Sequence, residues 1–154
     1  MQRIMIIGGP GAGKTWLANV IAEHRKLPLI SIDDMVWTAE RHLRPVSEID
    51  AAAIKATKGD RWIIEGGNTR TYADRLARAD TVIRLCPPRW LRILRLLRRK
   101  PLSRELLVWA WRYDAVFGPK DQMVVEDAKH RIQFFVLASR RDVQRFVEGL
   151  PTDL

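Results

Sequence analysis

The sequence predicts an α/β fold built around a parallel sheet, and two observations carry that prediction. Short apolar runs alternate along the chain with longer segments in which apolar residues recur every three or four positions. Such alternation is typical of βαβ units, whose strands run parallel. The second observation is a glycine-rich loop between the first apolar run and the first helical segment. With 154 residues and 47% hydrophobic content, the chain 1–154 is expected to form one domain.

Each expected strand is a short apolar run, and a helical segment follows it. The runs cover residues 4–7, 27–32, 61–65, 80–85 and 133–137. Glycine, proline or a capping residue marks most helix ends. The expected helices cover residues 16–26, 47–56, 71–78, 88–99, 103 up to the break at Gly118-Pro119, 121–130 and 143–150, with a polar loop at 38–45 and a capping box at 139–142.

The glycine-rich loop has the pattern G-x-x-x-x-G-K-T. Its residues are Gly8, Gly9, Pro10, Gly11, Ala12, Gly13, Lys14 and Thr15. The glycines allow backbone N–H groups to face phosphate oxygens, the lysine reaches the β- and γ-phosphates, and the threonine hydroxyl binds Mg2+. The alternative is a glycine-rich turn without a ligand. Because the loop lies between a strand and a helix, whose positive end faces the same anion, the pattern favours a nucleoside triphosphate site.

Carboxylates follow two of the expected strands. Asp33 and Asp34 come after the run 27–32, and Glu65 ends the run 61–65. Ligands of open α/β sheets bind at the carboxyl ends of the strands. We therefore expect Asp33 to orient or deprotonate an acceptor hydroxyl and Glu65 to hold Mg2+ through water. The alternatives are a turn cap for the aspartates and a salt bridge with an arginine for the glutamate.

Four further residues beside these strand ends are expected to contact the acceptor. Trp37 is expected to form a wall of its pocket, as an exception among six tryptophans that should mostly lie in the core. Gly66 and Gly67 would let a substrate approach the backbone closely. Asn68 has an amide that can hydrogen-bond the substrate, although it also suits a simple turn.

The net charge of +9 is a local feature of the chain. Residues 89–104 contain seven cations and no acids, so the rest carries only +2. A globally basic surface would favour nucleic acid, whereas one cationic helix also suits polyphosphate chemistry. Arg95 and Arg99 share a helix face and can stabilise the charge of a transferring phosphoryl group. The alternative for these arginines is a solvated helix face, which is expected for most members of the set Arg92, Arg95, Arg98 and Arg99.

The same helices are expected to be amphipathic. Trp90, Ile93, Leu94 and Leu97 share one side of the helix 88–99, away from its arginines. In the following helix we expect an inward-facing set of Leu106, Leu107, Trp109, Ala110 and Tyr113.

Other features restrict the cellular setting. Cys86 is the single cysteine, so an internal disulfide cannot form and the cytoplasm is the expected location. The first residues lack the pattern of a signal peptide, and no apolar run has membrane-spanning length, so no membrane association is expected. His24, His42 and His130 have no ligand-like spacing, and no zinc site is predicted.

Several motifs in this order resemble those of the P-loop small-molecule kinases of the adenylate and shikimate kinase type. Within that group, the chain is similar to the bacterial DNA topology modulation or FlaR-like proteins, which are adenylate-kinase-related. The resemblance covers nearly the whole chain. It rests on residues 6–15, Ile32-Asp33-Asp34 with Trp37, residues 62–68, residues 75–80, and Pro88-Arg89-Trp90 leading into 95–99.

The resemblance implies a three-layer α/β/α P-loop NTPase fold with about five strands in the order 2-3-1-4-5. It implies ATP and Mg2+ as cofactors and a short helical lid around residues 95–120. It places the adenine near residues 138–140, so that Arg140, like Trp16 after the loop, is expected to contact the nucleotide. Two departures are Glu65, where the relatives usually have Asp, and Trp16, where a second hydroxyl residue commonly follows the loop.

The predicted function is an ATP-dependent phosphotransferase that acts on a small molecule or nucleotide. Lys14, Asp33, Arg95 and Arg99 are the expected catalytic residues. The alternatives are a nucleic-acid-binding protein, which is less favoured, and a nucleotide-hydrolysing switch without an acceptor. The residues do not identify the acceptor, because strand-end carboxylates and glycines suit nucleosides, sugars and hydroxy acids alike.

Overall fold

The structure, a computed structural model, describes residues 1–36, 38, 42–98, 103–128 and 130–150. Its centre is one parallel sheet of five strands in the order β2-β3-β1-β4-β5, as the sequence and its resemblance predict. The strands are β1 Arg3–Gly8, β2 Leu29–Ser31, β3 Trp62–Glu65, β4 Thr81–Leu85 and β5 Gln133–Leu137.

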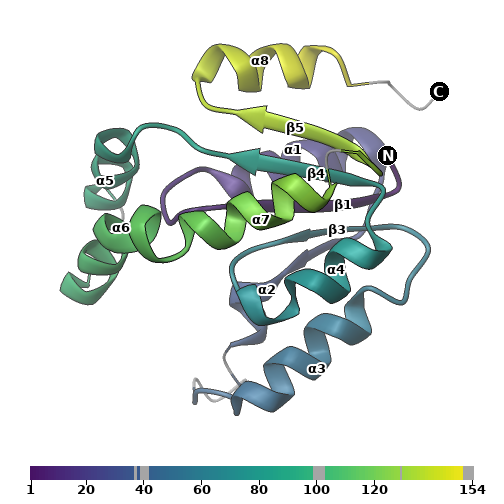
Figure 1. Ribbon diagram of the computed structural model, residues 1–154, viewed down its shortest axis with the longest axis horizontal. Helices are drawn as coiled ribbons and strands as arrows, with labels where there is room; N and C mark the ends of the chain where they lie inside the picture. The colour runs from purple at the N-terminus through teal and green to yellow at the C-terminus, as the bar shows by residue number, and fades with distance from the viewer. Residues whose placement is uncertain (37, 39–41, 99–102, 129, 151–154) are drawn as a thin grey trace.

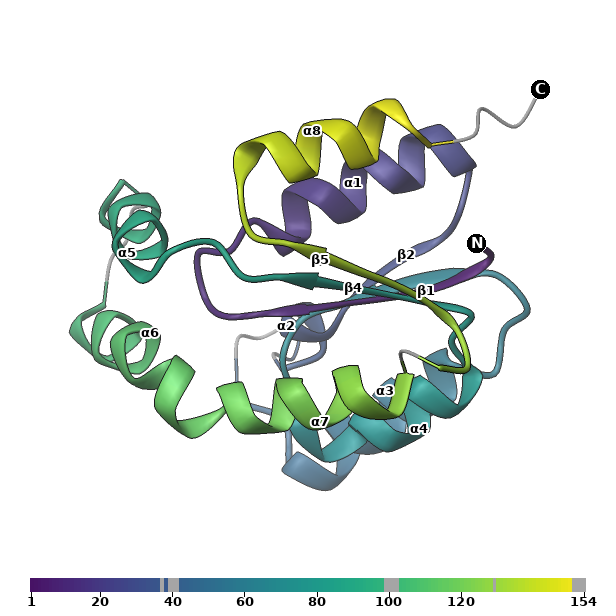
Figure 2. The same cartoon turned by 45° about the horizontal axis from the view of Figure 1, so that its top comes forward.

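Helices cover both faces of the sheet, which gives three layers (Figure 1). The helices are α1 Lys14–Arg25, α2 Ile32–Met35, α3 Val46–Ala56, the 3₁₀ helix η1 Thr69–Thr71, α4 Tyr72–Arg78, α5 Arg89–Leu97, α6 Arg104–Val116, α7 Gly118–Ala128 and α8 Arg140–Glu148. Figure 2 shows α1 and α8 on one face and α3, α4 and α7 on the other. Helices α5 and α6 lie beyond the carboxyl ends of the strands.

The core has two parts because β1 is covered on both faces. Ile4 and Ile6 pack with α1 and α8, whereas Met5 and Ile7 pack with residues of α3, α4 and α7. All four side chains are fully buried. A central parallel strand with two covered faces has a continuous apolar sequence, and this explains the run at 4–7.

The strand order determines where a ligand can bind. β1 pairs with β3 on one side and with β4 on the other, so the chain changes direction across the sheet at β1. Ligands of such sheets bind at the carboxyl ends of the strands beside this switch point. The glycine-rich loop follows β1 at this position.

Two predicted boundaries differ from the structure, and a predicted capping box is confirmed. β2 is shorter than the run 27–32, because the chain turns after Ser31 into the one-turn helix α2, which contains Asp33 and Asp34. The break between α6 and α7 is confirmed, but α7 begins at Gly118. Pro119 fits the first turn of a helix, where its missing N–H has no partner to lose. The predicted capping box of Ser139 and Asp142 is present at α8.

The expectation that most tryptophans lie in the core is wrong for the described residues. Only Trp62 is buried among the five tryptophans that the structure describes. The four exposed ones are Trp16, Trp90, Trp109 and Trp111, with 45–67% of their surface accessible. Trp109 was expected to face inward, but Ala110 and Tyr113 occupy the buried side of α6.

The orientation of α5 explains part of this difference. Its buried residues are Arg92 and Leu96, while Trp90 and Leu97 are more than half exposed. The solvated face expected for most arginines of residues 92–99 does not hold for Arg92, because a carboxylate partner, described below, allows this arginine to be buried. No helix in the described part of the chain combines the length and apolar content needed to cross a membrane.

Candidate active site

The loop after β1 is held by close backbone contacts. Gly8 and Gly11 have φ values of 142° and 75°, a range that favours glycine. A Cβ atom at Gly11 would lie 2.5 Å from the carbonyl oxygen of Arg92, and one at Gly8 would collide with the carbonyl oxygen of Leu85. The loop is therefore fitted between the end of β4 and α5, which explains why the pattern needs glycine at these positions.

Lys14 and Thr15 begin α1 at the end of this loop. The Lys14 ammonium donates a hydrogen bond to the Gly9 carbonyl oxygen at 3.2 Å, so the charge lies against the loop. The Thr15 hydroxyl donates to Glu65 Oε1 at 3.2 Å. The N-terminus of α1, the Lys14 ammonium and the Thr15 hydroxyl thus all lie beside the glycine-rich loop.

Glu65 lies where β1, β2 and β3 end. It is 1% exposed, and its Oε1 also accepts a hydrogen bond from the Ser31 hydroxyl at 2.8 Å. Its Oε2 is buried and has no hydrogen-bond partner among the described residues. The alternative of a salt bridge to an arginine is not observed for Glu65 within the described part of the chain. A buried carboxylate oxygen without a partner is costly, and a cation would satisfy it.

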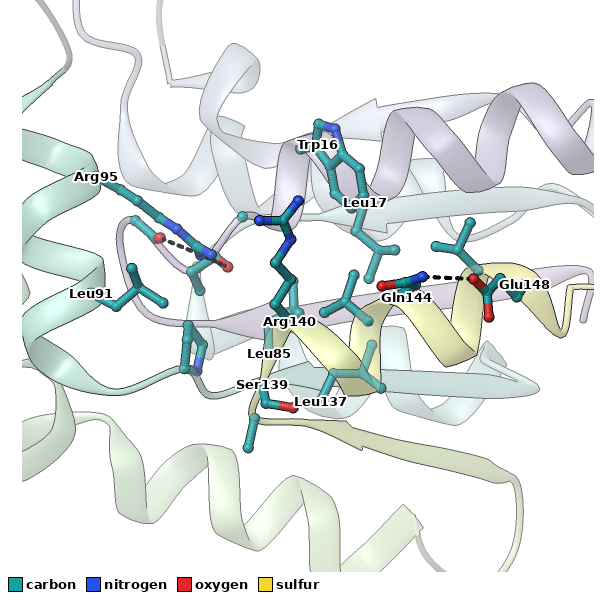
Figure 3. Close-up of a pocket in the computed structure, with 17 residues that line it drawn as sticks. Trp16, Leu17, Leu85, Leu91, Arg95, Leu137, Ser139, Arg140, Gln144 and Glu148 are labelled. Carbon is teal, nitrogen blue, oxygen red and sulfur yellow. Dashed lines mark hydrogen bonds between the residues drawn. The ribbon is translucent and has the colours of Figure 1, made fainter.

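A cavity of about 770 Å³ lies on the other side of the loop, between α1, α5 and α8 (Figure 3). Its apolar walls include Leu17, Leu85, Leu137, Val143 and Val147. Trp16, Arg95 and Arg140 also line it. An apolar cavity of this size with a few charged groups suits a flat aromatic ligand with a charged tail.

The arginines of α5 have different surroundings. Arg92 is buried, donates to Asp114 Oδ2, and places its guanidinium against Gly9. Arg95 donates to the carbonyl oxygens of Gly11 and Ala12 at 3.4 and 2.9 Å. Arg98 is exposed, as expected, and Arg99 lies outside the described residues. Arg92 therefore lies beside the glycine-rich loop 8–15, called the phosphate loop below, and Arg95 is hydrogen-bonded to it.

The residues expected to contact the acceptor lie at the ends of β2 and β3. Asp33 and Asp34 are exposed on α2, and a Cβ atom at Gly66 would lie 3.5 Å from Asp33 Oδ1. Gly67 faces open space. The Asn68 amide donates to Asp50 Oδ1 at 2.8 Å, so this amide already has a partner. Trp37 lies outside the described residues.

Sequence reasoning missed several residues that join these parts. Ser31 reaches Glu65, and its hydroxyl among apolar neighbours was the one available signal. Asp121 is 2% exposed and accepts hydrogen bonds from the hydroxyls of Tyr72 and Tyr113, each at 3.1 Å in its shorter contact. Burial raises the pKa of Asp121 and of both tyrosines. Tyr72 and Asp121 are 49 positions apart and Ser31 and Glu65 are 34 positions apart, so no local pattern indicates these contacts.

No protein-family model and no curated protein sequence matches the chain. Solved structures do match it. A shikimate kinase from Acinetobacter baumannii, in complex with shikimate, superimposes with a TM-score of 0.65 at 16% identity, over 96% of this chain and 90% of that one. A shikimate kinase from Bacteroides thetaiotaomicron gives a TM-score of 0.64 at 17% identity, over 96% of this chain and 94% of that one.

These comparisons agree with the architecture of the sheet and the helices around it. The five parallel strands, their order and the helices on both faces match over almost the full length of both chains. At this level of identity, the likeness concerns the fold. The chain has the P-loop kinase fold of the shikimate kinases.

Proposed function

We propose that the protein is an ATP-dependent phosphotransferase that acts on a small-molecule acceptor. The observation that carries the proposal is the contact between Thr15 and Glu65. It joins the hydroxyl of the phosphate loop to a buried acid on the neighbouring strand, and one oxygen of that acid has no partner in the described structure. A hydroxyl and an acid in this relation fit the Mg2+ site of P-loop enzymes.

The nucleotide would be held by the first loop and the adjoining cavity. Gly8 to Thr15 would cradle the phosphates, with Lys14 on the β- and γ-phosphates, and Thr15 and Glu65 would hold Mg2+. When bound, Mg2+ neutralises charge that develops on the phosphates. The base would occupy the cavity of about 770 Å³, where Trp16 and Arg140 line its walls.

The acceptor would bind at the ends of β2 and β3. Asp33 would orient its hydroxyl and take up the proton, because this carboxylate is exposed and lies close to Gly66. Asp34, Trp37, Gly66, Gly67 and Asn68 complete the proposed acceptor set. For Asn68, the backbone is the better candidate, since its side-chain amide is bound to Asp50.

Arginines within residues 92–99 would stabilise the transferring phosphoryl group. The sequence predicts Arg95 and Arg99 for this role, and both stay predictions. The structure adds Arg92 as a stronger candidate, because its buried guanidinium lies against Gly9 while Arg95 is bound to loop carbonyls. A fixed guanidinium beside the phosphates is worth roughly a thousandfold or more in the rate of phosphoryl transfer.

The proposal includes several finer points. The chain 1–154 would act as a single domain, with residues 95–120 closing over the nucleotide as a short lid. Within the P-loop kinases, its motifs place it near the FlaR-like, adenylate-kinase-related proteins. We also propose a cytoplasmic location, on the basis of the single cysteine.

Nucleic acid is the less favoured partner. A nucleic-acid groove needs a row of exposed cations that contact successive phosphates. On α5, however, Arg92 is bound to Asp114 and Arg95 to the phosphate loop. The cationic stretch is therefore partly turned inward, toward the proposed nucleotide.

The deciding experiment is an ATP-consumption screen of the purified protein against nucleotides and small hydroxylated metabolites, including shikimate. Lys14→Ala should lower turnover by about a thousandfold or more while the circular-dichroism spectrum is unchanged, because the phosphates lose their main cation. Lys55→Ala, which removes an exposed lysine of α3, is the matched control and should keep full activity. Equal turnover in wild type and Lys14→Ala would refute the proposal. ATP hydrolysis that no acceptor stimulates would instead favour the switch.

A further inference from the structure

The loop 66–68 after β3 is fixed by one buried arginine. Arg75 on α4 is fully buried, and its guanidinium donates to the carbonyl oxygens of Gly66, Gly67 and Asn68 at 3.3, 2.5 and 2.8 Å. These carbonyls are consecutive, so a single side chain fixes the orientation of three peptide groups. The planar fork of a guanidinium can do this, whereas the compact ammonium of lysine cannot.

The charge of Arg75 has no carboxylate partner within 4 Å among the described residues. Its nearest aromatic neighbour is Tyr72, whose ring centre lies 4.8 Å from the guanidinium carbon. Burial lowers the pKa of Arg75 to about 10, so the side chain is still a cation at pH 7. A buried cation is costly unless its donors are satisfied. Three carbonyl acceptors satisfy the two terminal nitrogens of the guanidinium, whereas its Nε is buried without a hydrogen-bond partner among the described residues.

The bonds to Arg75 also determine where the loop's N–H groups point. In a trans peptide, the N–H of one residue points opposite to the carbonyl of the residue before it. With the carbonyls of Gly66 and Gly67 directed at Arg75, the N–H groups of Gly67 and Asn68 point away from it. Neither N–H donates a backbone hydrogen bond within the described structure. A Cβ atom at Gly67 would meet nothing within 4 Å, so this side of the loop is open.

We infer that Arg75 is a positioning residue of the acceptor site, which fixes loop 66–68 so that two backbone N–H groups face an acceptor oxygen. The inference rests on the proposed function, which assigns loop 66–68 to the acceptor site. Arg75 itself does not touch the acceptor, because it lies on the buried side of the loop. Its role is to keep two donors in the orientation that binding requires.

A chain of contacts links Arg75 to the phosphate loop. Tyr72 lies beside Arg75 and donates to Asp121, which also accepts from Tyr113. Tyr113 in turn packs against the phosphate loop, since a Cβ atom at Gly9 would lie 3.0 Å from its ring. Helices α4 and α7, which contribute Tyr72 and Asp121, run side by side in both views (Figures 1 and 2). Through Tyr72 and Tyr113, Asp121 therefore connects helix α4, which carries Arg75, to the phosphate loop.

The test measures backbone order in loop 66–68 by nitrogen-15 relaxation, with affinity for ADP·Mg2+ measured by calorimetry on the same samples. In the wild type, Gly67 and Asn68 should have order parameters of about 0.85, as in rigid backbone. Arg75→Met should lower them below about 0.6. Arg75→Lys should behave like Arg75→Met, because it keeps the charge but loses the fork. The control Arg78→Met, an exposed position on the same helix, should leave the loop rigid.

The affinity for ADP·Mg2+ should change less than about threefold in the Arg75 variants, since the phosphate loop has its own contacts. A rigid loop in Arg75→Met or Arg75→Lys would overturn the inference. If Arg75→Met does not fold, Arg75→Lys decides, and failure of both to fold would assign Arg75 a purely structural role. A wild type that binds no ADP·Mg2+ would contradict the proposed function, whereas the order parameters would still decide on Arg75.

Discussion

The loops that follow β1 and β3 both lie at the centre of the site, but they are held in different ways. The phosphate loop is held by close backbone contacts, in which its glycines lie against the carbonyl groups of β4 and α5, and by hydrogen bonds from Lys14 and Arg95. The loop 66–68 is held by a side chain, Arg75, from the helix behind it. The first loop therefore depends mainly on the close approach that its glycines allow, whereas the second depends mainly on one buried guanidinium. Substitutions should affect the two loops differently.

The largest difference in unfolding free energy is expected between a glycine substitution in the first loop and one in the second. Gly11→Ala should cost about 2–4 kcal/mol of unfolding free energy, because the new Cβ would lie 2.5 Å from a backbone oxygen at a φ of 75°. It should also weaken ADP binding. Gly67→Ala, whose Cβ meets open space, should change the unfolding free energy by less than about 0.5 kcal/mol. Urea unfolding compares the two variants, and equal losses would show that the loops are held alike.

A smaller effect, confined to metal binding, is expected at Glu65, which lies between the two loops. Glu65→Gln keeps an oxygen for the hydroxyls of Thr15 and Ser31 but removes the negative charge. Affinity for ADP with Mg2+ should fall about tenfold, while affinity for ADP in EDTA should stay unchanged, because only the metal requires the charge. Calorimetry in both buffers measures this. Glu23→Gln, an exposed position on α1, is the control, and an equal fall in EDTA would argue against metal binding by Glu65.

The smallest effect is expected at Asp121, which connects the helices behind both loops. Burial raises its pKa above the ordinary value of 3.8, so the folded state holds the proton more tightly than the unfolded state. Its contribution to stability is therefore greatest below pH 4 and is lost as the pH rises through the folded pKa. Asp121→Asn lacks this dependence. Each tenfold difference in the acid dissociation constant between the folded and unfolded states changes the unfolding free energy by about 1.4 kcal/mol.

We accordingly expect the wild type to gain stability relative to Asp121→Asn when the pH falls from 7 to 4. Urea unfolding of both proteins at the two pH values measures the difference, and titrations common to both proteins cancel. A difference that stays constant or reverses between the two pH values would contradict the raised pKa.

The features that sequence predicted are those with a local cause. The run 4–7, the glycine pattern and Lys14 follow each other directly, so their arrangement in space follows from chain order. Glu65 could be placed near the loop because parallel strands end at one edge of the sheet. The resemblance to P-loop kinases supplied the strand order, which hydropathy alone does not determine.

The features that sequence did not predict depend on contacts between distant residues. Asp121 meets Tyr72 from 49 positions away, and Arg92 meets Asp114 from 22 positions away. Arg75 belongs to the motif 75–80 that supports the resemblance to P-loop kinases. An arginine on a short helix is usually solvated. Only the fold shows that this side chain is buried and faces three carbonyl oxygens. For α5, periodicity separated an apolar from a cationic side, but the buried residues are Arg92 and Leu96, which hydropathy alone does not indicate.

The position of Trp16 has a practical consequence for spectroscopy. This indole lines the proposed base cavity and is 59% exposed (Figure 3). A bound aromatic base would shield it from water, so its emission would shift to shorter wavelength as the cavity fills. Trp62, which is fully buried in the core, would give a constant background. The departure from the usual loop pattern thus gives the protein an intrinsic fluorescent reporter of its own cavity.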